Sequence, residues 1–382
     1  MKMKLYTSIA VILSIVIGSC KQSSHDVQDV VLIDDDDAID VNFEDVATDV
    51  RVAPVKGDTL IGECYELQCY GNEAFIFDYM NKTIYYLVNN EYKSALKAVG
   101  RGPGEYTGID DFSYCPDNKM LYVRTSRSTV LWYSVPEMKY SGKTQTDIYL
   151  MNFFVHDKNT FMVSSSIEDS IHYLTLVDIP TGREIKDIQN ISGFASARSS
   201  ESVASYRDGA HVYSLLGEIN TVIRVSDDNE YQQLFKYTFG DKSMSDKFTE
   251  IEDLASATEF YNVLFSSDGY KYLCGGYFLK VKRNDISFWY TRLRPSLDNP
   301  YYCYYKRSGN SETNLKGFRV PGLKNQIYPK CITDDGYVTV FEGTSDMIID
   351  PDTEPSPLAK KIIEAMDSQK DNNPVLLYFN IK

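Results

Sequence analysis

The sequence predicts an all-β fold: a six-bladed β-propeller with short helical insertions and a ring closed by N- and C-terminal strands. Two observations predict it. Short apolar and aromatic runs recur in pairs along the chain, and turn residues separate the members of each pair. The composition includes 30 Tyr, 18 Phe and 2 Trp, and aromatic side chains favour the pleated, half-buried surfaces of sheets.

The paired runs mark six predicted blades. Their markers Ile76, Tyr122, Met162, Val212, Tyr272 and Val338 are 46, 40, 50, 60 and 66 residues apart. A four-stranded blade takes about 40–50 residues, so the last two steps imply insertions. The pairs are 74–78 with 83–87, 120–123 with 129–134, 160–164 with 172–177, 211–215 with 221–225, 270–275 with 288–293, and 337–341 with the chain end.

Two terminal segments are expected to close the ring. Val41–Val55 alternates imperfectly and precedes the first recognisable blade, so it is a spare strand. Val375–Ile381 is a strand-like run that follows the loop 371–374. Because an unjoined first and last blade would expose a sheet edge, we expect these strands to share the sixth blade.

Helical spacing of apolar residues predicts two helices, Met244–Phe265 and Pro357–Met366. Either helix could pack on the side of the propeller or cover one of its mouths.

The N-terminus has the parts of an export signal. Lys2 and Lys4 precede an apolar stretch at 5–17, which is shorter than the roughly 20 residues that span a bilayer. Residues 17–20, Ile-Gly-Ser-Cys, look like a lipobox, in which the cysteine is acylated and the chain is cut before it. The alternative is an ordinary signal peptide with an incidental cysteine.

These features give the expected organisation and location. Residues 1–19 are a lipoprotein signal peptide, 20–40 are the lipidated Cys20 with a flexible acidic tether, and 41–382 are the propeller. Palmitate-type chains on Cys20 anchor the protein in the cell envelope. The next residues, Lys21 and Gln22, are not the aspartate that often retains lipoproteins in the inner membrane, so we expect the outer membrane, in its periplasmic or surface-exposed leaflet.

Charge excludes one class of partner. Cleavage after residue 19 removes two lysines and leaves 37 basic and 54 acidic residues, a net charge of −17. Nucleic acids require basic surfaces, so we expect no nucleic-acid partner. The six cysteines of the folded part form no C-x-x-C pair, and we expect mostly buried free thiols.

The most distinctive motif is Val-Gly-Arg-Gly-Pro-Gly-Glu-Tyr at 99–106. Pro103 lacks a donor N–H, so a phosphate cradle is not predicted. Arg101 and Glu105 have two interpretations: they pin the crossing between blades 1 and 2, or Arg101 points into a propeller mouth and meets an anionic or carbohydrate ligand. The candidate motif comprises Arg101, Gly102, Pro103, Gly104, Glu105 and Tyr106.

This motif resembles the GRGPGEY element of the lipoproteins called the 6-bladed β-propeller family, relatives of the NHL and TolB-like propellers. Residues 59–63, leading to Phe77-Asp78, look like the first blade of that family, and 371–377 looks like its C-terminal strand. The resemblance implies a propeller and an outer-membrane lipoprotein. It implies no activity, because members mostly lack an assigned one.

No catalytic signature such as G-x-S-x-G or H-E-x-x-H is present. We therefore expect a non-enzymatic binding or protein-interaction module without a cofactor, whose partner is an unknown protein or glycan. One candidate aromatic patch comprises Tyr301, Tyr302, Tyr304 and Tyr305, of which one alternating pair is expected in the core and the other is available for a sugar or a protein.

The competing class is a calcium-dependent lactonase- or lyase-like propeller. It would use acidic pairs such as Asp110-Asp111 or Asp227-Asp228 as ligands or as general acid and base. The histidines His156, His172 and His211 could converge on a metal, but they hold no regular blade position and we predict no metal site there.

Overall fold

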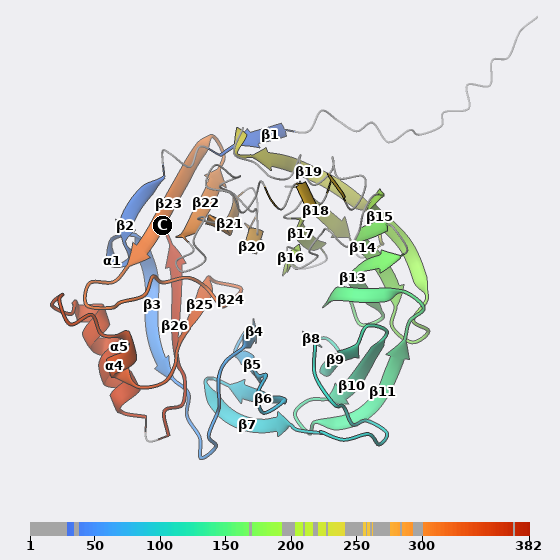
Figure 1. Cartoon of the computed structure of the whole chain (residues 1–382), viewed down its shortest axis with the longest axis horizontal. Coiled ribbons are helices and arrows are strands. Elements are labelled where there is room, and N and C mark those ends of the chain that lie inside the picture. Colours follow the sequence, from blue (N-terminus) through green and yellow to red (C-terminus); the bar gives the residue numbers. More distant parts are fainter. Residues whose placement is uncertain are drawn as a thin grey trace, which may run out of the picture.

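The computed structural model describes residues 29–33, 38–167, 170–192, 203–208, 211–216, 221–226, 228–240, 255–256, 258–259, 262, 276–282, 285–292, 301–369 and 371–382. Six sheets, each built on four antiparallel strands, stand around a central axis like the blades of a propeller (Figure 1). The predicted fold is therefore confirmed.

Blades 1 to 3 follow each other along the chain, each with four strands ordered from the axis outward. Blade 1 holds β4 (Glu66–Tyr70), β5 (Glu73–Asp78), β6 (Thr83–Val88) and β7 (Glu91–Leu96). Blade 2 holds β8 (Asp111–Cys115), β9 (Met120–Ser126), β10 (Thr129–Ser134) and β11 (Lys139–Gln145). Blade 3 holds β12 (Tyr149–Val155), β13 (Thr160–Ile167), β14 (Ser170–Asp178) and β15 (Glu184–Ser192).

Blades 4 and 5 have the same meander with a fifth strand added outside. Blade 4 holds β16 (Val203–Asp208), β17 (His211–Leu216), β18 (Thr221–Ser226) and β19 (Tyr231–Thr238), with β1 (Asp29–Leu32) beyond β19. Blade 5 holds β20 (Gly276–Lys282), β21 (Asp285–Arg292), β22 (Tyr301–Ser308) and β23 (Ser311–Arg319), with β2 (Ile39–Asn42) beyond β23. Five of the six predicted hairpins match these pairings. In the fifth, 270–275 lies outside the described residues, and β20 is the partner of β21.

Blade 6 closes the ring as predicted. Its strands are β24 (Cys331–Ile332), β25 (Tyr337–Phe341) and β26 (Val375–Ile381), followed outward by β3 (Ala47–Pro54). β3 pairs antiparallel with β26, from Val375 opposite Pro54 to Ile381 opposite Ala47. The prediction of one strand over Val41–Val55 was too simple, because the helix α1 (Phe43–Val46) divides that segment between blades 5 and 6.

Apolar clusters fill the spaces between neighbouring blades. In β5, alternate side chains serve two clusters: Phe75 and Phe77 pack against blade 2, while Ala74 and Ile76 pack against blade 6. Similar clusters join blades 2 and 3, 4 and 5, and 5 and 6. Because successive strand residues face opposite sides of a sheet, a strand enclosed on both sides must be apolar at nearly every position.

The predicted tether is shorter than expected. β1 adds parallel to β19, with Val31 opposite Tyr237, and β2 adds parallel to β23, with Ile39 opposite Leu315. Residues 29–33 and 39–42 thus belong to the propeller, which corrects the boundary drawn at residue 40. Asp34–Asp37 and Cys20 lie outside the described residues.

The C-terminal helix prediction is confirmed by α5 (Pro357–Asp367). Ser356 accepts a hydrogen bond from the N–H of Ala359 at 3.1 Å, and Pro357 begins the first turn, as expected at helix N-termini. α5 and the short α4 (Ser345–Ile348) lie outside blade 6 and cover no mouth (Figure 1).

In the predicted helix 244–265, residues 255, 256, 258, 259 and 262 are helical and the rest lie outside the described residues. None of the helices in the described part of the chain is long and apolar enough to cross a bilayer.

Candidate functional site

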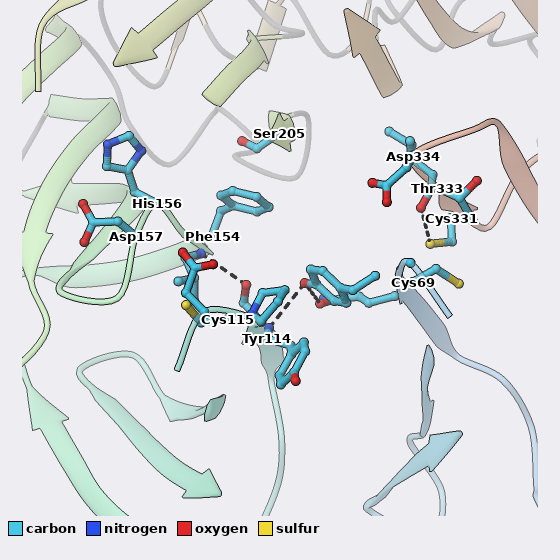
Figure 2. A pocket seen from close by; sticks show the side chains of 18 of the residues that line it. Cys69, Tyr114, Cys115, Phe154, His156, Asp157, Ser205, Cys331, Thr333 and Asp334 are labelled. Atoms are coloured by element: carbon cyan, nitrogen blue, oxygen red, sulfur yellow. Dashed lines mark hydrogen bonds between the residues drawn. The ribbon is translucent and has the colours of Figure 1, made fainter. Parts of the chain in front are cut away.

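A cavity opens where the innermost strands end around the axis. It has a volume of about 610 Å³, which lies within the range of small-molecule sites. Figure 2 shows its labelled side chains arranged around an open centre. The lining comes from β4, β8, β12, β16 and β24 and the turns that follow four of them: Gln68–Gly71, Ser113–Asp117, Phe153–Asp157, Ser205 and Cys331–Asp334.

The lining combines aromatic rings with polar groups and one sign of charge. Its partly exposed rings are those of Tyr70 and Phe154, and its partly exposed hydroxyls include those of Ser205 and Thr333, whereas Tyr114 and Phe153 are buried beside it. Three carboxylates, those of Asp117, Asp157 and Asp334, lie at the ends of three different blades, and the described lining holds no lysine or arginine. Such a surface suits hydroxyl-rich or positively charged ligands and disfavours anions.

Gln68 forms the floor of the cavity. Its amide nitrogen donates to Glu66 Oε1 and to the carbonyl oxygen of Phe112, both at 2.6 Å. Its Oε1 accepts the hydroxyl of Tyr70 at 2.8 Å, and that hydroxyl accepts the N–H of Tyr114 at 3.3 Å. Glu66, Gln68 and Tyr70 alternate along β4, so all three lie on the face of the strand that is turned toward blade 2.

Two carboxyl groups and a guanidinium lie beneath this floor. Burial, and then the charge of Asp111, raises the pKa of Glu66 to about 8, while burial raises the pKa of Asp111 to about 6 against the attraction of Arg124. Asp111 accepts the N–H of Phe153 at 3.3 Å, which joins blade 2 to blade 3. Arg124 lies 3.5 Å from Asp110 and partly neutralises the group.

The structure gathers no metal ligands where the competing hypothesis placed them. In the described ranges, no group of three or more His, Cys, Asp or Glu side chains could hold a metal ion. His156 is buried beside the cavity, while the side chains of His172 and His211 lie outside the described set. Asp110 pairs with Arg124, Asp228 caps a turn, and Asp227 is not described.

The glycine-rich motif is part of the crossing from β7 to β8, at the other end of β8 from the cavity. Glu105 accepts the N–H of Gly102 at 2.7 Å, and the Tyr106 hydroxyl donates to the carbonyl of Lys82 at 2.9 Å. Gly104 has a φ of +73°, and a Cβ there would approach the Tyr140 ring to 2.4 Å. These contacts support the interpretation that the motif pins blade 1 to blade 2.

Arg101 is exposed and does not line the cavity. Among the described residues it has no ion pair with Glu105. Within the motif, the contacts that hold the crossing are those of Glu105 and Tyr106 and the close packing of Gly104 against the Tyr140 ring.

The tyrosine-rich segment is core on both faces, which corrects the expectation of one free pair. Tyr304 packs between blades 5 and 6, and Tyr305 packs between blades 4 and 5. Tyr302 stacks on Tyr328 with ring centroids 3.9 Å apart. The side chain of Tyr301 lies outside the described set.

Of the five described cysteines, Cys69 is half-buried and the other four are buried. Cys69, Cys115 and Cys331 line the cavity.

Sequence reasoning missed the cavity and its floor. A signal was present in Glu66-Leu67-Gln68-Cys69-Tyr70, where polar side chains alternate in a strand next to fully apolar ones. Such alternation marks a strand with one face on water, and the innermost strand of a propeller is the one that lines the channel.

Comparisons with known proteins agree with the fold. A family model described as a 6-bladed beta-propeller matches residues 19–290. The solved structure of a Bacteroides fragilis protein described as exported is 14% identical, with a TM-score of 0.64, and covers 92% of this chain and 99% of its own. A DUF4221-family member from Bacteroides vulgatus is 11% identical, with a TM-score of 0.48, covering 88% and 98%. No curated protein matches significantly.

Proposed function

The chain belongs to a family of six-bladed β-propellers, and we propose that it is a lipid-anchored, non-enzymatic binding protein of the cell envelope. The observation that carries the proposal is the cavity of about 610 Å³ at the end of the channel. Four blades contribute strand ends and turns to the cavity, and a fifth blade contributes Ser205. The walls of the cavity are therefore part of the propeller ring itself.

The chemistry of the cavity favours a neutral, hydroxyl-rich ligand such as a glycan segment. Aromatic faces offer stacking surfaces to sugar rings, and ionised carboxylates accept hydrogen bonds from hydroxyl groups. An anionic ligand would meet the carboxylates of Asp117, Asp157 and Asp334.

The arrangement of the channel favours binding over catalysis. The half-buried Glu66 and Asp111 have the raised pKa values that general acids can have, but Gln68 lies between them and the cavity. A ligand in the cavity therefore meets an amide and hydroxyls before it meets either of these carboxyl groups.

The binding proposal is tested with matched neutral and acidic sugars. A glycan array, followed by calorimetry, should find a saturable neutral glycan and a much weaker response to its uronic-acid counterpart. The double variant Asp117→Asn/Asp334→Asn should weaken binding of the neutral ligand about thirtyfold and reduce the discrimination against the acid, because each lost charge-assisted hydrogen bond costs about 1 kcal/mol. Asp147→Asn is the control, since Asp147 is an exposed aspartate before β12, at the opposite end from the cavity.

The anchor is tested separately. We propose that acyl chains on Cys20 hold the protein at the outer membrane, which the lipobox-like sequence at 17–20 supports. Cys20→Ala should abolish incorporation of labelled palmitate and release the protein from membranes. A variant that stays bound through a salt wash would contradict the anchor.

A further inference from the structure

Three aliphatic side chains are exposed on the outer rim of blades 4 and 5. Val30 and Leu32 of β1 are 61% exposed, and Ile39 of β2 is 64% exposed. Their neighbours Val31 and Ile33 are buried among the side chains of blades 4 and 5. We call Val30, Leu32 and Ile39 the rim patch.

Two members of the rim patch, Leu32 and Ile39, meet at the boundary between the two blades. Leu32 and Ile39 line one groove of about 400 Å³, together with Leu315 of β23. The groove is shallow and outward-facing because β1 and β2 are the outermost strands of their sheets. A contiguous apolar surface at this position is a site of interaction with a partner or a membrane.

The short segment between Cys20 and β1 indicates that the partner of the rim patch is the bilayer. Only eight residues, 21–28, separate Cys20 from Asp29, and nine residue steps span at most about 30 Å whatever their conformation. A globular chain of this size is about 50 Å across. An acyl group on Cys20 therefore keeps blade 4 near the bilayer, and β1 leaves the ring at its rim (Figure 1).

We propose that the rim patch rests on the bilayer surface, so that the propeller stands on its edge with the channel axis parallel to the membrane. The inference depends on the proposed lipid anchor at Cys20. In this orientation both ends of the channel open to water sideways, and blade 1, across the ring from blade 4 (Figure 1), lies farthest from the membrane. The cavity stays open to soluble or cell-surface ligands.

Charge selects the kind of lipid. The chain carries a net charge of −15, and four aspartates at 34–37 lie between β1 and β2 in sequence. The net negative charge of the protein opposes contact with anionic headgroups. The contact is therefore apolar, and a surface of zwitterionic lipids is the one that fits it.

The test uses the full lipidated protein in vesicles of phosphatidylcholine with brominated acyl chains, which quench tryptophan only on contact. Leu32→Trp places the probe on the rim patch. Met80→Trp is the matched control, because Met80 is 75% exposed and lies in the β5–β6 turn of blade 1. The native Trp132 and Trp289 contribute the same background to both variants.

The expected result is that Leu32→Trp loses emission on brominated vesicles by about twofold relative to Met80→Trp, and that the loss shrinks when anionic lipid is added. Equal quenching of both probes, or none at position 32, overturns the edge-on orientation. Flotation of the unmodified protein is scored in parallel. Failure to float overturns the anchor and the orientation together, whereas flotation without quenching at position 32 overturns the orientation alone.

Discussion

Replacing Glu66 with glutamine should stabilise the propeller at alkaline pH and change little at pH 5. Glu66 is half-buried in the channel, and burial is the main cause that raises its pKa from 4.5 to about 8. The folded protein therefore holds this proton more tightly than the unfolded chain. The resulting stability is fully present below pH 4.5 and is lost as the pH rises towards 8.

The size of the effect follows from the shift. A change from 4.5 to about 8 corresponds to at most about 5 kcal/mol of unfolding free energy, at 1.36 kcal/mol for each pKa unit. Glutamine has no charge to desolvate and keeps an oxygen that accepts the amide of Gln68. At pH 9 the Glu66→Gln protein should be more stable than the wild type by about 2–5 kcal/mol.

Urea unfolding of the mature chain at pH 5 and pH 9 measures this difference. Glu63→Gln is the control, because Glu63 is exposed and the change removes the same charge three residues away. The reasoning is refuted if the advantage of Glu66→Gln over the wild type is equal at both pH values, or if the Glu63→Gln protein gains as much at pH 9.

Three further predictions concern the fold. Gly104→Ala should destabilise the propeller by about 1–3 kcal/mol, because its Cβ would clash with Tyr140. The control Gly71→Ala, at a φ of +59° with open space around it, should cost about 1 kcal/mol. Equal losses in thermal unfolding would contradict the interpretation that the close approach at Gly104 pins blade 1 to blade 2. Deleting 29–33 should lower the melting temperature by several degrees through loss of β1, while deleting 21–28 should leave it unchanged, and the reverse order would show that β1 is not part of the sheet. Leu377→Ala in the closing blade should cost about 2–5 kcal/mol in urea unfolding, since Leu377 is fully buried between blades 5 and 6; a cost under 1 kcal/mol would argue against that packing.

The propeller could be predicted because its blades repeat a local pattern. Hairpins such as 74–78 with 83–87 are separated by a few turn residues, so both strands and the turn are visible in one short window of sequence. The closing strand 375–381 could also be predicted. It is a continuous apolar run at the end of the chain, and a closed ring needs a strand from that end to complete its last blade.

The N-terminal strands could not be predicted from their own residues. In 29–33 only Val31 and Ile33 face the core, and acidic residues follow at once. The partner strands, β19 for β1 and β23 for β2, lie two hundred or more residues away, so the pairing depends on sheet edges that the sequence does not mark. The tyrosines at 301–305 were misjudged for a related reason: alternation gave the two faces correctly, but both faces of β22 are enclosed by neighbouring blades.

The cavity was hidden for a geometric reason. Its side chains are spread from Gln68 to Asp334, and each turn contributes only one or two polar residues. Only the closure of the ring brings Asp117, Asp157 and Asp334 to one end of the channel. The most distinctive motif, at 99–106, lies in a crossing between blades and contributes no residue to the cavity.

The most direct test of the proposed function is a crystal structure of the mature protein with the neutral glycan that binds it most tightly. The proposal predicts density for a sugar in the cavity at the ends of β4, β8, β12 and β24, with an aromatic face of Tyr70 or Phe154 against the ring and a carboxylate of Asp117, Asp157 or Asp334 on its hydroxyls. A glycan bound instead at Arg101, or in the groove between α5 and β3, with the cavity holding only water, would contradict it.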